Sequence, residues 1–244
     1  MLEYLKKFGY AQPEISEYVR DNIVVAKEID IAPHVKEKIP FWCLRVGGEQ
    51  WMTYDFVYHS SAYEVFSHYS LATGHCILTG LGFGVREQWL LNKKEVTKLT
   101  VIEKNIEVIE YHQYKKSPFL EHVEIIHADA DQYKGKCNTL LLDHYENINN
   151  RECLNSVKKV SLNIDCDLLW FWPIEMIISD KDFKTYDKNA KNEYNEIKLK
   201  YGLHKLPDLT EEELFKFIAT FHAKDLSDEL RKEIFGIDFF EKNV

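Results

Sequence analysis

The chain has 244 residues, 45% of them hydrophobic, and a formal net charge of −9 from 40 acidic and 31 basic side chains. This length suits one α/β domain with additions at both ends, and the apolar fraction is ample for a core. The acidic balance argues against a nucleic-acid substrate, because phosphates reward a basic face. We therefore expect a small-molecule substrate.

Motifs of membrane, secreted and metal proteins are not found in the sequence. It holds no apolar run near the roughly 18 residues of a membrane span, and its first residues do not resemble a secretion signal. The five cysteines form no C-x-x-C pair, so neither a zinc site nor a disulfide framework is indicated. We expect a cytoplasmic protein with free, buried thiols, no bound metal and no membrane association.

Residues 1–70 are expected to form an N-terminal cap. Residues 13–21 read as helix and residues 23–25 as a short strand. Two strand-like stretches, residues 42–46 and 50–58, are joined at Gly47-Gly48, which is a hairpin signal. Four aromatic residues of the second stretch either line a substrate pocket or pack the hairpin: Trp51, Tyr54, Phe56 and Tyr58.

Three alternate glycines, Gly80, Gly82 and Gly84, separate an apolar run at residues 76–78 from a helix-like segment at residues 85–91. Only glycine lets the backbone turn so tightly after a strand and leave room for a ligand against the main chain. The following helix N-terminus offers N–H groups to an electronegative ligand group. Val85 breaks the dinucleotide fingerprint, so the pattern is G-x-G-x-G.

Strand-like and helix-like segments alternate after this loop. Strands are expected at residues 99–103, 123–127, 138–143 and 167–172, and helices at residues 104–114 and 149–160. This alternation predicts an α/β fold with a Rossmann-like, doubly wound and mostly parallel sheet over residues 71–180. In such sheets ligands sit outside the C-terminal strand ends, near the switch point of strand order.

Acidic residues follow the second and third of these strands. Glu103 lies about 20 residues beyond the glycines, where a carboxylate can accept both hydroxyls of a ribose. The alternative for Glu103 is a solvated acid that pairs with Lys104. Asp129 can accept the exocyclic amine of adenine, with Asp131 as a rival for that role.

Asp143 ends the most apolar strand. A carboxylate at such a mouth can act as a base or hold a substrate amine, and the alternative is a helix cap or a buried ion pair. His144, Tyr145 and Glu146 extend the same edge and can face a second substrate. We expect the reacting groups among these four residues.

The stretch of residues 75–143 resembles class I S-adenosylmethionine-dependent methyltransferases, and most of all their spermidine synthase-like branch. The resemblance is carried by the glycine loop, the Arg86-Glu87 pair and the V-I-E ending at Glu103. Residues 64–71 (EVFSHYSL) are similar to the E-M-L-A-H-L-P-L segment of polyamine aminopropyltransferases, and residues 143–146 (DHYE) to their D-S-S-D.

The resemblance implies the class I methyltransferase fold and binding of S-adenosylmethionine or its decarboxylated form. It implies cofactor contacts by the following residues: Gly80, Leu81, Gly82, Gly84, Glu103, Lys104, Asp129, Ala130 and Asp143. The chain also departs from the family pattern. Phe83 replaces the loop acid of aminopropyltransferases, and Leu78 stands where methyltransferases often carry an acid for the methionine ammonium group. We therefore expect a cofactor pocket with an altered substrate pocket.

Residues 181–244 are predicted to be a charged, helical extension packed on the core. Helices are expected at residues 181–201, 210–221 and 227–235, the second after a capping box at Thr210. Either the sheet is truncated or residues 237–240 return as an edge strand. The extension either covers the active site or mediates a homodimer. Elsewhere, His68 lies one helical turn after Glu64, which indicates a helix-face hydrogen bond or ion pair, with binding of a metal or a substrate amine as the alternative.

Three functions remain open from the sequence. The first is an S-adenosylmethionine-dependent methyltransferase, a transferase that acts on a small-molecule acceptor. The second is a spermidine synthase-like aminopropyltransferase, in which Asp143 and Glu146 hold a polyamine. The third is a non-catalytic protein that keeps the fold as a binding or interaction module.

Overall fold

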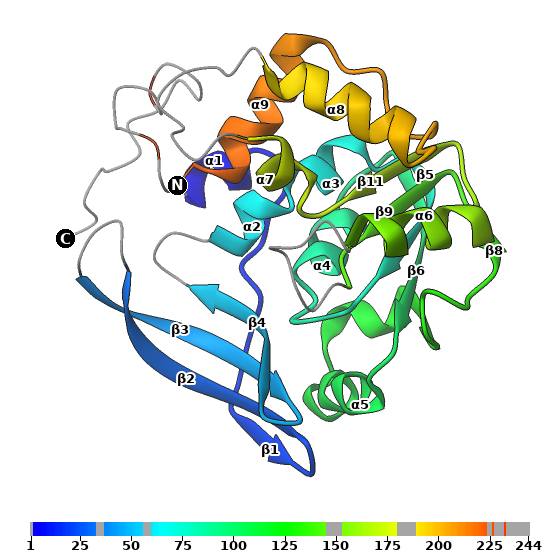
Figure 1. Ribbon diagram of the computed structural model, residues 1–244. Coiled ribbons are helices and arrows are strands. Elements are labelled where there is room, and N and C mark those ends of the chain that lie inside the picture. Colours follow the sequence, from blue (N-terminus) through cyan, green and yellow to red (C-terminus); the bar gives the residue numbers. More distant parts are fainter. Residues whose placement is uncertain are drawn as a thin grey trace.

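The computed structural model describes residues 2–32, 37–55, 60–144, 153–179 and 189–223, together with Leu226 and Lys232. The described chain forms an antiparallel sheet near the N-terminus, a parallel central sheet with helices around it, and a further group of helices after it (Figure 1). A short parallel ribbon joins β8 (Gly135–Lys136) to β10 (Ile164–Asp165).

The N-terminal sheet has four antiparallel strands in chain order. These are β1 (Tyr18–Arg20), β2 (Ile23–Ala32), β3 (Glu37–Val46) and β4 (Glu49–Asp55). The predicted hairpin is confirmed, because Gly47 and Gly48 turn the chain at positive φ, 63° and 85°, between β3 and β4. Tyr54 is fully buried and packs the hairpin, whereas Phe56 and Tyr58 lie outside the described residues.

The helix predicted at residues 13–21 is wrong. Residues 11–17 have no regular structure and the next three form β1, while the described N-terminal helix is α1 (Leu2–Lys6). Asp21 takes a left-handed φ of 48°, and the turn brings Tyr18 opposite Val25 of β2. A hairpin forms here because Asp and Asn side chains favour turns and tolerate positive φ.

The central sheet holds five parallel strands in the order β11-β9-β5-β6-β7. Their bounds are β5 (Gly74–Thr79), β6 (Val96–Glu103), β7 (Val123–His127), β9 (Thr139–Leu142) and β11 (Leu168–Phe171). All five predicted strands are confirmed. The chain moves outward from β5 to β7 and then continues on the other side of β5, so the switch point lies between β5 and β9.

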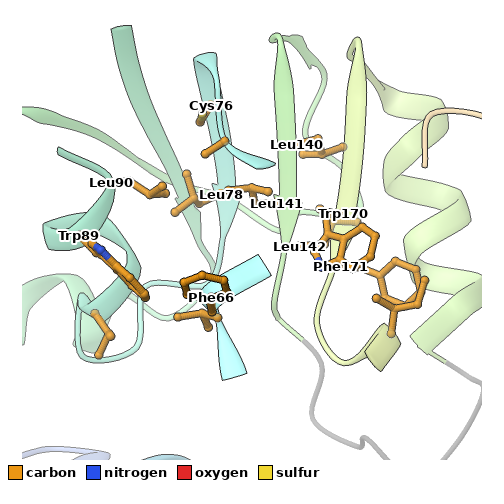
Figure 2. Packing of buried hydrophobic residues seen from close by; sticks show 14 of the residues in the cluster. Phe66, Cys76, Leu78, Trp89, Leu90, Leu140, Leu141, Leu142, Trp170 and Phe171 are labelled. Atoms are coloured by element: carbon orange, nitrogen blue, oxygen red, sulfur yellow. The ribbon is translucent and has the colours of Figure 1, made fainter. Parts of the chain in front are cut away.

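The middle of this sheet is apolar on both faces. All of β9 is buried, and Leu141 pairs with Leu78 of β5 on one side and Trp170 of β11 on the other (Figure 2). Each fully buried aliphatic or aromatic side chain of this kind stabilises the fold by about 1.5–3 kcal/mol. This packing fixes the strand ends that carry the candidate site.

Helices cover both faces of the sheet. The connecting helices are α4 (Val85–Leu91) between β5 and β6, α5 (Ile106–Lys115) between β6 and β7, and α6 (Cys153–Asn163) between β9 and β11. Right-handed crossovers that run in opposite directions along the sheet put α4 and α5 on one face and α6 on the other. The predicted doubly wound, Rossmann-like architecture is therefore confirmed (Figure 1).

Further helices flank the core. They are α2 (Ser60–Glu64) and α3 (Phe66–Leu71) before β5, and α7 (Ile174–Ile178), α8 (Asn189–Lys200) and α9 (Glu211–Phe221) after β11. Helix α9 contacts α2, α3 and α7, and its predicted capping box between Thr210 and Glu213 is confirmed.

The outer edge of β11 meets an irregular segment. The carbonyl of Lys205 accepts a 2.9 Å hydrogen bond from the N–H of Leu169, so one backbone group of this edge is satisfied there. The helix predicted at residues 227–235, apart from Lys232, and the edge strand predicted at residues 237–240 lie outside the described residues.

Each of the five cysteines is buried and free of disulfide bonds, as predicted. Burial raises the pKa of Cys76 to about 11 and that of Cys137 to about 12, so these thiols are protonated and unreactive at neutral pH. Within the described part of the chain, no helix combines the length and apolar character of a membrane span.

Candidate functional site

The glycine loop turns the chain from β5 into α4 as predicted. Gly80, Gly82 and Gly84 all lie in the left-handed region, with φ of 75°, 50° and 73°. A side chain at any of these positions would be strained by its backbone conformation. It would also meet a neighbouring group: the Asp143 carbonyl at Gly80, and the Phe119 ring at Gly84.

Glu103 holds this loop against the end of β6. Its carboxylate is buried, and Oε2 accepts a 2.8 Å hydrogen bond from the N–H of Leu81 while Oε1 accepts a 2.7 Å bond from that of Asn105. Burial raises the pKa of Glu103, although these backbone hydrogen bonds favour its ionised form. Each oxygen keeps a second lone pair, so the carboxylate can still accept a ribose hydroxyl.

The alternative that made Glu103 a solvated acid paired with Lys104 is wrong. Glu103 is only 5% exposed. The Lys104 ammonium group is turned to the next strand end, where its Nζ lies 3.9 Å from Oδ2 of Asp129.

His112 braces the loop from α5, a role that sequence reasoning missed. Its Nε2 donates a 2.8 Å hydrogen bond to the Gly82 carbonyl, and Nδ1 accepts a 2.8 Å bond from the hydroxyl of Ser117. Burial lowers the pKa of His112 to about 4, so the ring is neutral at pH 7 and can accept at Nδ1. No local motif marks this residue, because it touches a loop 30 residues away.

Arg86 ties the loop to the end of β9. Its Nη2 donates to the carbonyls of Thr79, at 2.9 Å, and Gly80. Its Nη1 lies 3.5 Å from Oδ2 of Asp143. The guanidinium is only 6% exposed, so its charge acts on Asp143 through little water.

Asp143 stands at the mouth of the sheet, at the end of β9. Its side chain is 30% exposed and faces Arg86, which agrees with the ion-pair alternative and leaves the carboxylate reachable. Desolvation raises the pKa of Asp143, and the Arg86 charge opposes that shift. Such a carboxylate is a better base than a solvated one.

His144 is held in a chain of hydrogen bonds. Because the Ser156 hydroxyl donates to Asp131 Oδ1 at 2.6 Å, it accepts from His144 Nε2 at 3.2 Å. Nδ1 of His144 then accepts from the hydroxyl of Thr79 at 2.6 Å. Burial lowers the pKa of His144 to about 4, so a neutral ring links β5 and β9 to α6. Tyr145 and Glu146 lie outside the described residues.

The two acids after β7 have different surroundings. Asp131 is engaged by α6, since its carboxylate accepts from Ser156 at 2.6 Å and from Lys159 at 3.2 Å. Asp129 accepts at Oδ1 from the N–H of Asp131, and its side chain is 33% exposed. Ala130 between them is buried. The two side chains are similarly exposed, 33% for Asp129 and 29% for Asp131, so they differ in that α6 holds Asp131 and not Asp129.

The predicted hydrogen bond or ion pair between Glu64 and His68 is wrong. The helix is interrupted at Val65, between α2 and α3, so the two residues do not share one continuous helix. His68 is 1% exposed, neither ring nitrogen has a hydrogen-bond partner, and burial beside Arg86 lowers its pKa well below the usual value. Among the described residues, no cluster of His, Cys, Asp and Glu is arranged as metal ligands.

The sheet order brings the candidate residues to one edge. Asp143 follows β9, the glycine loop follows β5, Glu103 ends β6 and Asp129 lies just after β7, and these four strands are consecutive neighbours in the parallel sheet. Parallel strands present their carboxyl ends on the same side, at the switch point where ligands bind in such folds.

Comparison with known proteins reveals similarity of structure only. No family model and no curated protein matches the chain. The spermidine synthase from Thermotoga maritima is 13% identical, with a TM-score of 0.44 over 92% of this chain and 88% of that one. A spermidine synthase in complex with the transition-state analogue AdoDATO is 14% identical, with a TM-score of 0.44 over 92% and 87%.

An S-adenosylmethionine-dependent methyltransferase from Clostridium acetobutylicum is 14% identical, with a TM-score of 0.35 over 55% of this chain and 59% of that one. The chain itself has a Rossmann-like α/β fold around a five-stranded parallel sheet. A fold of this kind does not by itself define an activity.

Proposed function

We propose that this protein is an S-adenosylmethionine-dependent methyltransferase acting on a small-molecule acceptor. One observation carries the proposal: the glycine loop and three carboxylates, Glu103, Asp129 and Asp143, lie at neighbouring strand ends around the switch point. The acidic balance of the chain supports a small-molecule acceptor rather than a nucleic acid. Five free thiols support a reducing, cytoplasmic setting.

The residues fit the nucleoside part of this cofactor. Glu103 has lone pairs left for ribose hydroxyls, and Asp129 offers a partly exposed carboxylate to the adenine amine two strands from the loop. The methionine part fits less well. Leu78 is a fully buried strand residue, so it leaves no acid for an ammonium group at that position.

The bound cofactor would supply an electrophilic methyl group on a sulfonium. Transfer in line needs mainly alignment, so the chain has few chemical tasks to perform. Asp143 would hold the acceptor or take its proton, and Arg86 would stabilise the carboxylate between turnovers. His144 has both ring nitrogens engaged, so it would position the end of β9 rather than exchange a proton.

Calorimetric titration tests this proposal with S-adenosylmethionine, S-adenosylhomocysteine and decarboxylated S-adenosylmethionine. We expect micromolar binding of the first two. Glu103→Ala should weaken it at least about tenfold, since a hydrogen bond to a charged group is worth about 1.5–3 kcal/mol. Glu121→Ala, at an exposed position outside the site, is the matched control.

Two other outcomes decide between the alternatives. A preference for the decarboxylated ligand would favour an aminopropyltransferase, which is consistent with the acid-rich strand ends. Absence of binding by all three ligands in correctly folded protein would reject both enzymes and leave the non-catalytic module.

A further inference from the structure

Met52 of the N-terminal hairpin lies directly on the glycine loop. Its Sδ accepts a hydrogen bond from the N–H of Phe83 at 3.3 Å. A β-carbon built on Gly82 would lie 2.5 Å from the same sulfur. The thioether therefore fills the space that the missing side chain of Gly82 leaves open.

The hairpin directs Met52 to this place. On β4, Met52 and the fully buried Tyr54 share one face, because alternate residues of a strand point the same way. Across the hairpin, Met52 pairs with Leu44 of β3, which is also buried. The face of the hairpin that carries Met52 is thus the face that packs on the core.

This contact competes with the use expected of the loop. A glycine at the second loop position lets a ligand approach the backbone closely. In this protein the Met52 side chain occupies that space beside Gly82 and accepts a hydrogen bond from the N–H of Phe83. A thioether is a weak acceptor and a methionine side chain is flexible, so the contact can be exchanged for a stronger one.

We propose that Met52 covers the glycine loop and is displaced by the part of an adenosyl ligand that extends beyond its ribose. The inference rests on the proposed function for the nature of the ligand. The methionine part of the ligand is accommodated only after the Met52 side chain has moved off the loop. The cost of opening is subtracted from the affinity, because only the open fraction binds.

The effect of Met52 on affinity should therefore depend on whether the ligand extends beyond its ribose. Adenosine ends at the ribose and has no group to compete with Met52, whereas S-adenosylhomocysteine carries a thioether and an amino-acid tail. Met52→Ala should strengthen binding of S-adenosylhomocysteine by about tenfold, a gain of 1.4 kcal/mol, and leave adenosine unchanged. Met52→Leu keeps the bulk and should give no gain.

The contact itself can be measured without any ligand. Amide hydrogen exchange of Phe83, followed by NMR, should become faster in Met52→Ala because its N–H loses both partner and cover. Gln50→Ala is the matched control, since Gln50 is an exposed residue of the same strand and its side-chain oxygen accepts from the thiol of Cys43, with no described contact to the loop. This variant should leave both the exchange rate and the affinities unchanged.

The outcomes separate this inference from the proposed function. If wild type binds S-adenosylhomocysteine and Met52→Ala binds it equally or more weakly, the displacement by ligand is rejected while the proposed function stands. If neither protein binds an adenosyl ligand, the proposed function and the displacement both fail. Equal exchange of Phe83 in wild type and Met52→Ala would reject the closed loop itself.

Discussion

The N–H of Leu81 donates a 2.8 Å hydrogen bond to Oε2 of Glu103, so the acid at the end of β6 holds the loop at the end of β5. The same carboxylate accepts from the N–H of Asn105 at 2.7 Å. One buried side chain therefore joins the glycine loop to the first residues before α5. The loop structure therefore depends on the carboxylate that we propose binds the ribose.

Glu103→Gln should lower the free energy of unfolding by about 1–3 kcal/mol. The amide has one accepting oxygen where the carboxylate has two, so one of the two backbone N–H groups is left buried without a partner. Urea denaturation at pH 7 measures this change. Glu121→Gln, at an exposed acid, should stay within about 0.5 kcal/mol of wild type. Equal stability of Glu103→Gln and wild type would show that the bridge to Leu81 is not formed.

The strands and the loop were predictable because their signals are local. Apolar runs identify the strands β5, β6, β7, β9 and β11. The three glycines mark a turn at positive φ that other residues make only with strain. The parallel order then brings Glu103, Asp129 and Asp143 to one edge without any knowledge of side-chain contacts.

The contacts that brace the loop were not predictable, because they join residues far apart in the chain. His112 reaches Gly82 over 30 positions and Met52 reaches Phe83 over 31. No local sequence pattern around a helical histidine or a strand methionine predicts a contact with a distant loop. The interruption of the helix at Val65 likewise depends on packing. As a result His68 does not pair with Glu64 as expected, and its buried imidazole has no hydrogen-bond partner.

Asp129 and Asp131 should separate binding from stability. Asp129→Asn keeps the acceptor for the N–H of Asp131 but loses charge, so it should weaken adenosyl-ligand binding about tenfold at unchanged stability. Asp131→Asn removes the negative charge of the carboxylate to which Ser156 and Lys159 donate, and it should lower the free energy of unfolding by about 1–3 kcal/mol. Calorimetry and denaturation of both variants test this. The reverse assignment of effects would make Asp131 the ligand-binding acid.

His112 offers a pair of variants that differ in one hydrogen bond. His112→Gln places an amide near the position of Nε2 and can still donate to the Gly82 carbonyl, whereas His112→Leu cannot. We expect His112→Leu to be less stable than His112→Gln by about 1–3 kcal/mol, and to bind adenosyl ligands more weakly, because an unpartnered carbonyl remains in the loop. Thermal unfolding and titration measure the two effects. Identical behaviour of the two variants would contradict the brace.

Two further acids, Glu87 and Glu175, are buried. Glu87 is fully buried and neither of its oxygens has a hydrogen-bond partner, although Arg86 Nη2 lies 3.9 Å away. Glu175 is also buried and accepts at Oε1 from the indole of Trp170 at 3.2 Å. Desolvation raises the pKa of each carboxyl to about 7.

Glu87→Gln should change the pH dependence of stability. Since the pKa of Glu87 is raised from 4.5 to about 7 on folding, the folded protein binds more protons between these values, and this carboxyl stabilises least above pH 7. An amide does not titrate. Relative to wild type, the variant should gain about 1.4 kcal/mol of unfolding free energy per pH unit from about pH 5 to 7, and no more above.

Urea denaturation of wild type and Glu87→Gln at several pH values measures this gain. The comparison removes the opposite contribution of His112 and His144, whose lowered pKa values make stability rise with pH in both proteins. Glu121→Gln serves again as the exposed control and should run parallel to wild type. If Glu87→Gln also runs parallel, Glu87 is ionised in the folded protein throughout this range, and Arg86 rather than desolvation governs its charge.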